Sequence, residues 1–374
     1  MKIQKTIFLL LFGVMLLLPI LKFDFQSKIS LNENRDLSAL PKLFQTSTVN
    51  WQFFSQLDSY IKDRFGFRNE LVDLDAKIQY EFLKSAGNSR VLLGKEDWYF
   101  YIDKKDNSNY DDYLKRNLVD QTTVKKFIRK LKDRAKWCEQ NNIQFIFVVI
   151  PNKHGIYSEF YPYPRPEGIT RAEQFLNPLR NTNINYLFPK KLFISQKNKF
   201  SLYYKNDTHW NNYGAFLFFK ELKNKLATIL PDSRLPNYNF KMETREEDVG
   251  QLPAILGFKD KKTVLYPFYE PENASWDDIF VYKGKNRVAM LSKKERLVTT
   301  EAKDKNLPTA IIFRDSFFNS LYPFTSSIFS RADYFWKNFE ESDKNYILQN
   351  KPDVIIWEIV ERGLGEVVRI PWSN

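Results

Sequence analysis

The sequence predicts an α/β fold in which helices cover both faces of a largely parallel sheet. Two observations favour this class. Short runs of consecutive apolar residues, typical of strands buried on both faces, occur at residues 143–150, 310–313 and 354–358. Helical patterns alternate with these runs along the chain. An apolar segment precedes the alternation and a less regular stretch interrupts it. The full prediction is therefore a membrane anchor, an α/β domain and a β-rich insertion.

The first residues predict a membrane segment. Residues 1–5 include two lysines, and residues 6–21 are almost entirely apolar, with Gly13 and Pro19 as the only clear breaks. This length lies between that of a signal-peptide core and that of a free-standing span. No small-x-small cleavage pattern follows. Residues 1–23 are therefore interpreted as an uncleaved signal-anchor, with the rest of the chain outside the cytoplasm. A cleaved signal peptide is the alternative.

Residues 24–50 are interpreted as an extended lead, because they are rich in polar residues and contain Pro41. The main domain, residues 51–374, follows. Apolar residues at helical spacing indicate a helix within 51–80 and another at 71–83. Two short β-like segments on either side of a Gly-Lys-Glu-Asp turn indicate a hairpin over residues 90–102.

Helices and strands alternate from residue 121 onward. An amphipathic pattern predicts a helix at 121–141, and Pro151 ends the apolar strand at 143–150. The same reasoning predicts the remaining elements in chain order: a helix at 171–180, a strand at 184–188, a helix at 211–230, a strand at 310–313, a helix beginning at 316, a helix at 346–349 and a strand at 354–358. Such alternation indicates a parallel sheet with helical crossovers.

Residues 231–305 depart from this alternation. They are rich in Pro, Asp and Lys and contain short β-like segments at 262–266 and 278–282. We interpret them as an insertion or β-rich lobe beside the site, suited to selecting the substrate.

Charge and cysteine content limit the possible partners. The chain has 57 Lys and Arg residues against 45 Asp and Glu, a formal net charge of +12. This balance suits an acidic polysaccharide, a nucleic acid or anionic lipid, although a generally basic solvated surface would look the same. The lysines are scattered and form no recognisable nucleic-acid module, so no nucleic-acid partner is expected. The single cysteine, Cys138, cannot form an internal disulfide.

Two motifs supply the residue types of a serine acyl-transfer site. Asp207 precedes His209, one of only two histidines, by two residues, and Ser316 follows the strand at 310–313 where a helix is predicted to begin. Side chains at i and i+2 in extended backbone point to the same side, so Asp207 can reach His209. The Ser316 N–H lies where an oxyanion would be stabilised. These residues predict Ser316 as nucleophile, His209 as base and Asp207 as the carboxylate that orients it.

Other interpretations of these residues stay open. Asp207 and Asp315 could simply cap the helices that follow them. A metal site at Asp207 and His209 would need further ligands, and only His154 and Cys138 offer additional side chains of the usual types. We expect neither a metal nor an organic cofactor.

Three further residues are predicted to contact substrate. His154 follows the Pro151 that ends a strand, and ligands of α/β folds bind at the carboxyl ends of strands. Lys153 and Arg314 could hold an anionic or hydroxyl-rich substrate. A structural role is the alternative for each of the three.

At these motifs the sequence resembles the alginate O-acetyltransferase family, whose members are membrane-anchored or periplasmic and contain an SGNH-hydrolase-like domain. That family carries an Asp-x-His-Trp-Asn signature upstream of a Gly/Arg-Asp-Ser-Phe signature, as residues 207–211 and 314–317 do here. Further similar segments extend over most of the chain, at residues 34–35, 51–68, 94–98, 151–157 and 352–362. The chain departs from ordinary SGNH hydrolases at Arg314, where those enzymes have glycine.

The resemblance implies an SGNH-hydrolase-like fold and a Ser-His-Asp triad that transfers acetyl groups to hydroxyls of an exopolysaccharide or other envelope glycan. It also implies a multipass membrane acyltransferase that delivers the acetyl donor. We expect a bacterial inner-membrane anchor with the domain in the periplasm or outside. A sugar on the Asn206 sequon would crowd Asp207, which fits a host that does not glycosylate it. Two alternatives stay open: a carbohydrate O-acetyl esterase, and a non-catalytic glycan-binding or assembly protein.

Overall fold

The computed structural model describes residues 2–27, 29–30, 35–45, 48–68, 70–71, 74, 90–102, 109–231, 235–248, 252–253, 263–283 and 297–372. Most of the helix predicted at 71–83, and parts of the insertion predicted at 231–305, lie outside these residues. The chain divides into two units, which are Met1–Leu92 with Gly250–Lys261, and Leu93–Val249 with Lys262–Asn374.

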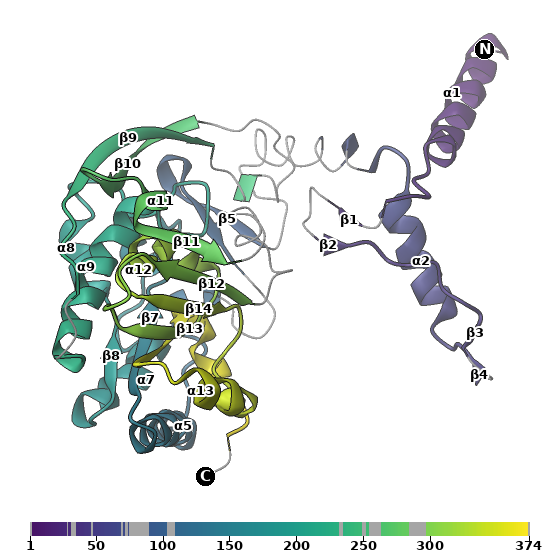
Figure 1. The fold of residues 1–374 in the computed structure, drawn as a ribbon. Coiled ribbons are helices and arrows are strands. Elements are labelled where there is room, and N and C mark those ends of the chain that lie inside the picture. The colour runs from purple at the N-terminus through teal and green to yellow at the C-terminus, as the bar shows by residue number, and fades with distance from the viewer. Residues whose placement is uncertain are drawn as a thin grey trace. The chain divides into compact units, whose positions relative to one another are not determined.

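The first unit begins with one apolar helix, α1 (Lys2–Leu21), purple in Figure 1. Its segment Gln4–Leu21 is long and apolar enough to cross a membrane, and a signal sequence or an anchor would have this form. The end of α1 is joined to the residues after α2 (Phe53–Arg64), because Gly66 N–H donates to the Pro19 carbonyl over 3.1 Å. Two short hairpins accompany these helices, β1 (Ile29–Ser30) with β2 (Arg35–Asp36), and β3 (Phe44–Gln45) with β4 (Thr48–Val49).

A seven-stranded sheet forms the centre of the second unit. Its strand order is β11-β12-β14-β13-β15-β7-β8. The five strands from β14 to β8 run parallel, and β12 and β11 extend one edge in antiparallel orientation. The strands are β7 (Gln144–Ile150), β8 (Asn185–Leu187), β11 (Phe280–Lys283), β12 (Leu297–Ala302), β13 (Thr309–Phe313), β14 (Arg331–Phe335) and β15 (Val354–Val360). The predicted α/β class is confirmed.

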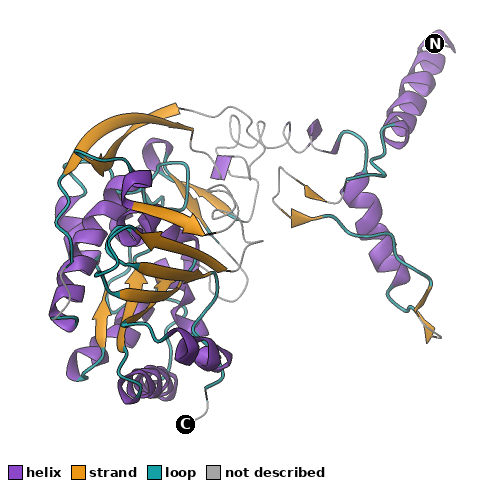
Figure 2. Cartoon of the chain, in the orientation of Figure 1, coloured by secondary structure: helices purple, strands orange, loops and turns teal. Residues whose placement is uncertain are grey.

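Helices cover both faces of this sheet (Figures 1 and 2). Tyr334 and Phe335 follow one another in β14 and therefore point to opposite faces. The Tyr334 hydroxyl lies 2.8 Å from Ser326 Oγ in α12 (Tyr322–Ser326), whereas the Phe335 ring packs against Tyr346 in α13 (Lys344–Asn350). Helices α5 (Gln121–Gln140) and α7 (Arg171–Leu176) share the core on the α13 face, and α9 (Asn212–Ile229) packs beside α12.

The central elements follow from local sequence. Every residue of β15, and every residue of β7 except Gln144, is buried, as parallel strands covered on both faces require. The Asp120 carboxylate accepts a hydrogen bond from Thr123 N–H and starts α5, and the Asn211 side chain caps α9 in the same way. The helix predicted at 171–180 is α7 followed by a 3₁₀ helix, η3 (Asn177–Asn181), because Pro178 has no N–H to continue an α-helix.

Some elements differ from the sequence prediction. Strand β14 was not predicted. The helix predicted from residue 316 begins as a 3₁₀ helix, η5 (Ser316–Leu321), before α12. Within 231–305, β11 and β12 extend the central sheet, whereas β9 (Phe240–Asp248) and β10 (Thr263–Pro271) form a separate antiparallel ribbon. The remaining described elements of the chain are β5 (Val91–Leu93), η1 (Lys95–Asp97), β6 (Tyr99–Tyr101), α4 (Asn109–Tyr113), α6 (Lys153–Ile156), η2 (Ser158–Phe160), α8 (Lys190–Gln196), α11 (Trp276–Ile279), η6 (Glu341–Asp343) and η7 (Glu361–Glu366).

Candidate active site

Ser316 lies just beyond the carboxyl end of β13, at the start of η5. Strand β13 pairs with β14 on one side and with β15 on the other, so the strand order reverses here, where α/β folds bind ligands. The Asp315 carboxylate accepts hydrogen bonds from Phe317 N–H over 2.7 Å and from Val360 N–H over 2.9 Å. These bonds fix the turn and leave the Ser316 side chain partly exposed.

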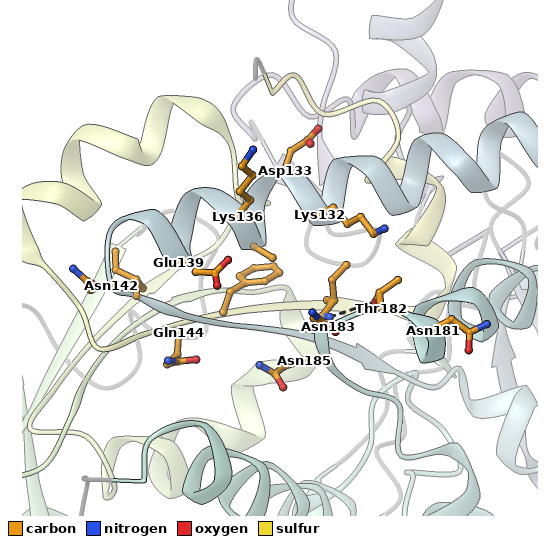
Figure 3. Close-up of a pocket in the computed structure, with 14 residues that line it drawn as sticks. Lys132, Asp133, Lys136, Glu139, Asn142, Gln144, Asn181, Thr182, Asn183 and Asn185 are labelled. Carbon is orange, nitrogen blue, oxygen red and sulfur yellow. Dashed lines mark hydrogen bonds between the residues drawn. The ribbon is translucent and has the colours of Figure 1, made fainter.

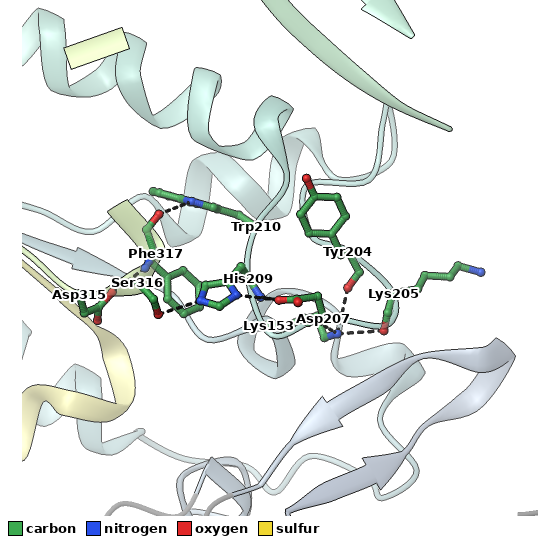
Figure 4. A network of polar contacts seen from close by, with 9 residues as sticks. All are labelled: Lys153, Tyr204, Lys205, Asp207, His209, Trp210, Asp315, Ser316 and Phe317. Atoms are coloured by element: carbon green, nitrogen blue, oxygen red, sulfur yellow. Dashed lines mark hydrogen bonds and ion pairs between the residues drawn. The ribbon is translucent and has the colours of Figure 1, made fainter. Parts of the chain in front are cut away.

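His209 lies in a loop that an antiparallel bridge between Tyr203 and Trp210 closes. Asp207 Oδ1 accepts a hydrogen bond from His209 N–H over 2.8 Å and lies 2.7 Å from His209 Nδ1 (Figure 4). Burial acts to raise the pKa of the Asp207 carboxyl, but the hydrogen bonds and charge of His209 and the charge of Lys153 outweigh it. The pKa of Asp207 therefore lies below its usual value. An ionised Asp207 keeps the ring proton on Nδ1.

The loop and the turn meet at two hydrogen bonds. His209 Nε2 lies 2.8 Å from Ser316 Oγ, and Trp210 Nε1–H donates to the Phe317 carbonyl over 2.7 Å. The structure thus brings Ser316, His209 and Asp207 together, as their positions in the sequence predict. A hydroxyl, an imidazole and a carboxylate hydrogen-bonded in this order can pass the hydroxyl proton to the ring as the oxygen attacks an acyl carbon.

Lys153, predicted to contact substrate, binds the main chain of the loop at residues 203–210, called here the histidine loop. Its Nζ donates to three main-chain carbonyl oxygens, those of Tyr204 and Lys205 over 3.0 Å each and that of Asp207 over 2.7 Å. Only 5% of the residue is exposed. Burial lowers the pKa of Lys153 to about 7, although the Asp207 charge acts in the opposite direction.

The other two predicted substrate contacts are also buried. The His154 ring packs edge-on against Tyr113 and Tyr161, and burial, together with nearby positive charges, lowers the pKa of His154 to about 3, so the ring is neutral. The Arg314 guanidinium lies 4.0 Å from the centre of the Trp336 ring and donates to Asn319 Oδ1. Contact of either residue with substrate stays a prediction.

Glu358 is a site residue that the sequence reasoning missed. Its Oε2 accepts a hydrogen bond from Asp315 N–H over 2.9 Å, and the residue is 1% exposed within β15. Burial, followed by the charge of Asp315, raises the pKa of Glu358 well above its usual value, which favours the neutral acid. One signal was available, because Glu358 is the only charged residue of an otherwise apolar strand.

A groove of about 870 Å³ lies at the opposite end of β7 (Figure 3). Its lining comes from α5, from the residues just before β7 and β8, and from the first residues of these strands, among them Gln144 and Asn185. Lys153 follows the other end of β7, and none of the predicted site residues lines this groove.

Comparison with known proteins gives one matching family model and several similar proteins. A family model described as the SGNH hydrolase-like domain of acetyltransferase AlgX matches residues 91–291, which is just over half of the chain. The probable alginate O-acetylase AlgJ of Pseudomonas fluorescens is 22% identical over 349 residues, covering 85% of this chain and 79% of that protein. The structure of Bacillus cereus PatB1 with a sulfonyl adduct has a TM-score of 0.55 at 15% identity, covering 75% of this chain and 100% of that one.

The O-acetyltransferase domain of Pseudomonas putida AlgJ has a TM-score of 0.46 at 16% identity, covering 74% of this chain and 92% of that one. At its level of identity, the likeness to PatB1 shows a shared fold. The matching family model includes Asp207 and His209 and ends before Ser316. The chain belongs to the AlgX/AlgJ family of SGNH hydrolase-like acetyltransferases.

Proposed function

We propose that this protein is an O-acetyltransferase that acts on hydroxyl groups of an exopolysaccharide or other cell-envelope glycan. One observation carries the proposal: Asp207, His209 and Ser316 form a continuous line of hydrogen bonds of 2.7 and 2.8 Å. Membership of an acetyltransferase family supports the reaction type. The basic chain, with a net charge of +12, supports an anionic rather than a cationic acceptor.

In the first half of the reaction, Ser316 Oγ attacks the carbonyl carbon of an acetyl ester. His209 Nε2 takes the hydroxyl proton as the Oγ–C bond forms, and Asp207 stabilises the resulting imidazolium. The Ser316 N–H, at the start of η5 and without an intrahelical acceptor, is available to the oxyanion. The bond to the donor oxygen then breaks, and His209 returns the proton to the departing alcohol. Acetyl-Ser316 remains.

In the second half, a glycan hydroxyl attacks the acetyl carbon of acetyl-Ser316. His209 takes the proton of that hydroxyl, and the bond between Ser316 Oγ and the acetyl carbon breaks. Ser316 Oγ recovers the proton from His209, so the products are an acetylated glycan and the starting enzyme. No metal or organic cofactor takes part. Water in place of the sugar would make the same site an esterase.

The location and the donor are further parts of the proposal. An apolar α1 supports attachment to a bacterial inner membrane with the second unit in the periplasm or outside. An acetyl group must be delivered there, and a multipass membrane acyltransferase is the proposed supplier. Neither the glycan acceptor nor the acetyl donor is a nucleic acid.

The full chain in detergent, supplied with 4-nitrophenyl acetate and a panel of neutral and uronate oligosaccharides, tests the proposal. We expect slow release of acetate without sugar and acetylated oligosaccharide with the correct acceptor, both lost in Ser316→Ala. Ser320→Ala, in the same short helix, is the matched control and should behave as wild type. Acetate as the sole product with every acceptor would favour the esterase. Equal background in all three proteins, with glycan binding retained, would indicate a non-catalytic protein.

A further inference from the structure

The carbonyl groups of the histidine loop converge on one buried cation. The bridge between Tyr203 and Trp210 closes the loop, and three of its carbonyl oxygens point to Lys153 Nζ at 2.7–3.0 Å. The Lys205 carbonyl also accepts a hydrogen bond from Tyr99 N–H over 2.9 Å. The loop contributes only an isolated bridge to β-structure, so Lys153 satisfies backbone groups that a sheet would otherwise pair.

Three carbonyl acceptors require three N–H donors. An ammonium has three N–H groups, whereas a neutral amine has two and a lone pair. Loss of the proton would therefore place a lone pair against one of the carbonyl oxygens. The geometry is consistent with the protonated form, and it couples the shape of the loop to the charge of Lys153.

Two aromatic rings and the Asp207 charge also act on the Lys153 ammonium. The rings of Trp98 and Phe100 lie 5.5 and 5.2 Å from Nζ and can stabilise a cation through their faces. The Asp207 charge also favours the ammonium form of Lys153. Lys205 is exposed, contacts the Trp98 ring at 5.9 Å and donates to the Glu96 carbonyl.

We propose that Lys153 is a positioning residue, whose ammonium gathers the carbonyls of Tyr204, Lys205 and Asp207 and thereby holds the Asp207 carboxylate in line with His209. This inference rests on the proposed function, because it concerns the same site. It assigns Lys153 a role in shaping the loop in place of the substrate contact that the sequence suggests.

The inference has a pH signature. Because burial lowers the pKa of Lys153 to about 7, the ammonium is lost above that pH and the rate of Ser316 acetylation should fall. Folding stability should change in the opposite direction. The folded pKa lies below the unfolded value near 10.5, so between these values the unfolded chain binds more protons and the contribution of Lys153 to the free energy of unfolding increases with pH.

The experiment compares the full chain with Lys153→Met, Lys153→Arg and the control Lys191→Met, at an exposed lysine of α8, all in detergent. Acetylation of Ser316 by 4-nitrophenyl acetate is followed by intact-mass spectrometry from about pH 6 to about pH 10. Lys153→Met should be slower by about 10²-fold below pH 7, since small displacements of catalytic groups have effects of this size. It should also lack the alkaline decline. Lys191→Met should retain both the wild-type rate and the decline.

A spectroscopic readout separates positioning from general stability. The low-field proton resonance of the Asp207–His209 hydrogen bond should be present in wild type and Lys191→Met and shifted or lost in folded Lys153→Met. A folded Lys153→Met with the wild-type rate and pH profile would overturn the inference.

Lys153→Arg and wild type keep the inference testable if Lys153→Met does not fold. A guanidinium stays charged over this range, so Lys153→Arg should show no alkaline decline. The same decline in wild type and Lys153→Arg, or no decline in wild type, would contradict the inference. Ser316→Ala distinguishes the two proposals. Acetylation that persists in this variant refutes Ser316 as the nucleophile and hence the proposed function. If Ser316→Ala is not acetylated and Lys153→Met is acetylated at the wild-type rate, only the positioning role of Lys153 is refuted.

Discussion

The loop that carries Asp207 and His209 and the turn that carries Ser316 are stabilised in opposite ways. In the loop, a buried ammonium, that of Lys153, donates to main-chain carbonyl oxygens. In the turn, two carboxyl groups accept from main-chain N–H groups: the partly buried Asp315 binds two of them and the buried Glu358 binds a third. The loop and the turn, the two halves of the site, are both irregular backbone: Lys153 pairs carbonyl oxygens of the loop, whereas Asp315 and Glu358 pair N–H groups of the turn.

Because of this difference, the loop and the turn can be tested separately. The loop depends on a proton that Lys153 must keep, whereas the turn combines an Asp315 that accepts two N–H bonds with a Glu358 whose neutral form burial favours. The halves meet through His209 with Ser316 and through Trp210 with Phe317. A change in one half should alter the rate chiefly through these two bonds.

The largest effect is expected within the loop, from Asp207→Asn. The amide cannot hold the His209 Nδ1 proton as the carboxylate does, so the acetylation rate of Ser316 should fall by about 10³–10⁴-fold. Because Asn is nearly isosteric with Asp, far-ultraviolet circular dichroism should show no change of fold. An acetylation rate within tenfold of wild type would contradict the assigned role of Asp207.

Within the turn, Asp315→Asn should mainly reduce stability. Asp315 accepts from Phe317 and Val360 N–H groups, and an amide would turn a donor toward one of them. The free energy of unfolding should fall by about 1.5–3 kcal/mol, the range for hydrogen bonds to a charged group. Denaturant unfolding measures the loss. The control is Asp304→Asn, at an exposed aspartate that accepts from Asn306 N–H, and its effect should be much smaller. Equal effects at the two positions would show that the Asp315 contacts add little.

The sequence was sufficient to predict the strands that are apolar throughout and the two motifs that meet at the candidate active site. Residues 143–150 and 354–358 correspond closely to β7 and β15, since nothing in them competes with a strand buried on both faces. It was insufficient for β14, where Arg331 and Asp333 interrupt the apolar pattern. The structure satisfies Asp333 with Arg331, at 3.1 Å, and with Thr299 Oγ1, at 2.6 Å. Thr299 lies on β12, so no local pattern could reveal this pairing.

The role of Lys153 could not be predicted for a similar reason. The sequence supplies a lysine after a strand, but the three carbonyl acceptors lie more than fifty residues later. Carbonyl groups belong to every residue and leave no compositional signal. Glu358 differs, because a carboxyl group in an apolar strand is itself a signal of a buried partner.

Within the turn, Glu358→Gln should change the free energy of unfolding by less than Asp315→Asn, and the change should depend on pH. The pKa of Glu358 is raised in the folded state, so its stabilising contribution is complete below the unfolded value near 4.5 and is lost as pH rises through the folded pKa. Relative to Glu358→Gln, which does not titrate, wild type should lose stability as pH rises above 4.5. Unfolding midpoints measured across this range test the sign. A difference between the two proteins that stays constant with pH would contradict a raised pKa.

Deletion of residues 1–22 should have the smallest effect on either half of the site. The removed residues include Pro19, whose carbonyl accepts from Gly66 N–H, and Lys22, whose ammonium lies over the Phe67 ring. The described contacts that are lost therefore involve residues that follow α2. Ser316 acetylation should be nearly unchanged, while the protein should move from the membrane fraction to the soluble fraction. Mature native protein that begins near residue 27 would instead indicate a cleaved signal peptide.

The most direct test of the central claim is to locate the acetyl group on the full chain after brief reaction with 4-nitrophenyl acetate. Peptide mapping by mass spectrometry should find the acetyl group on Ser316 in wild type and nowhere in Ser316→Ala. Labelling in His209→Ala should be slower by several orders of magnitude, since this variant lacks the base 2.8 Å from Ser316 Oγ. Acetyl found on other residues alone, or equal Ser316 labelling in wild type and His209→Ala, would contradict the account.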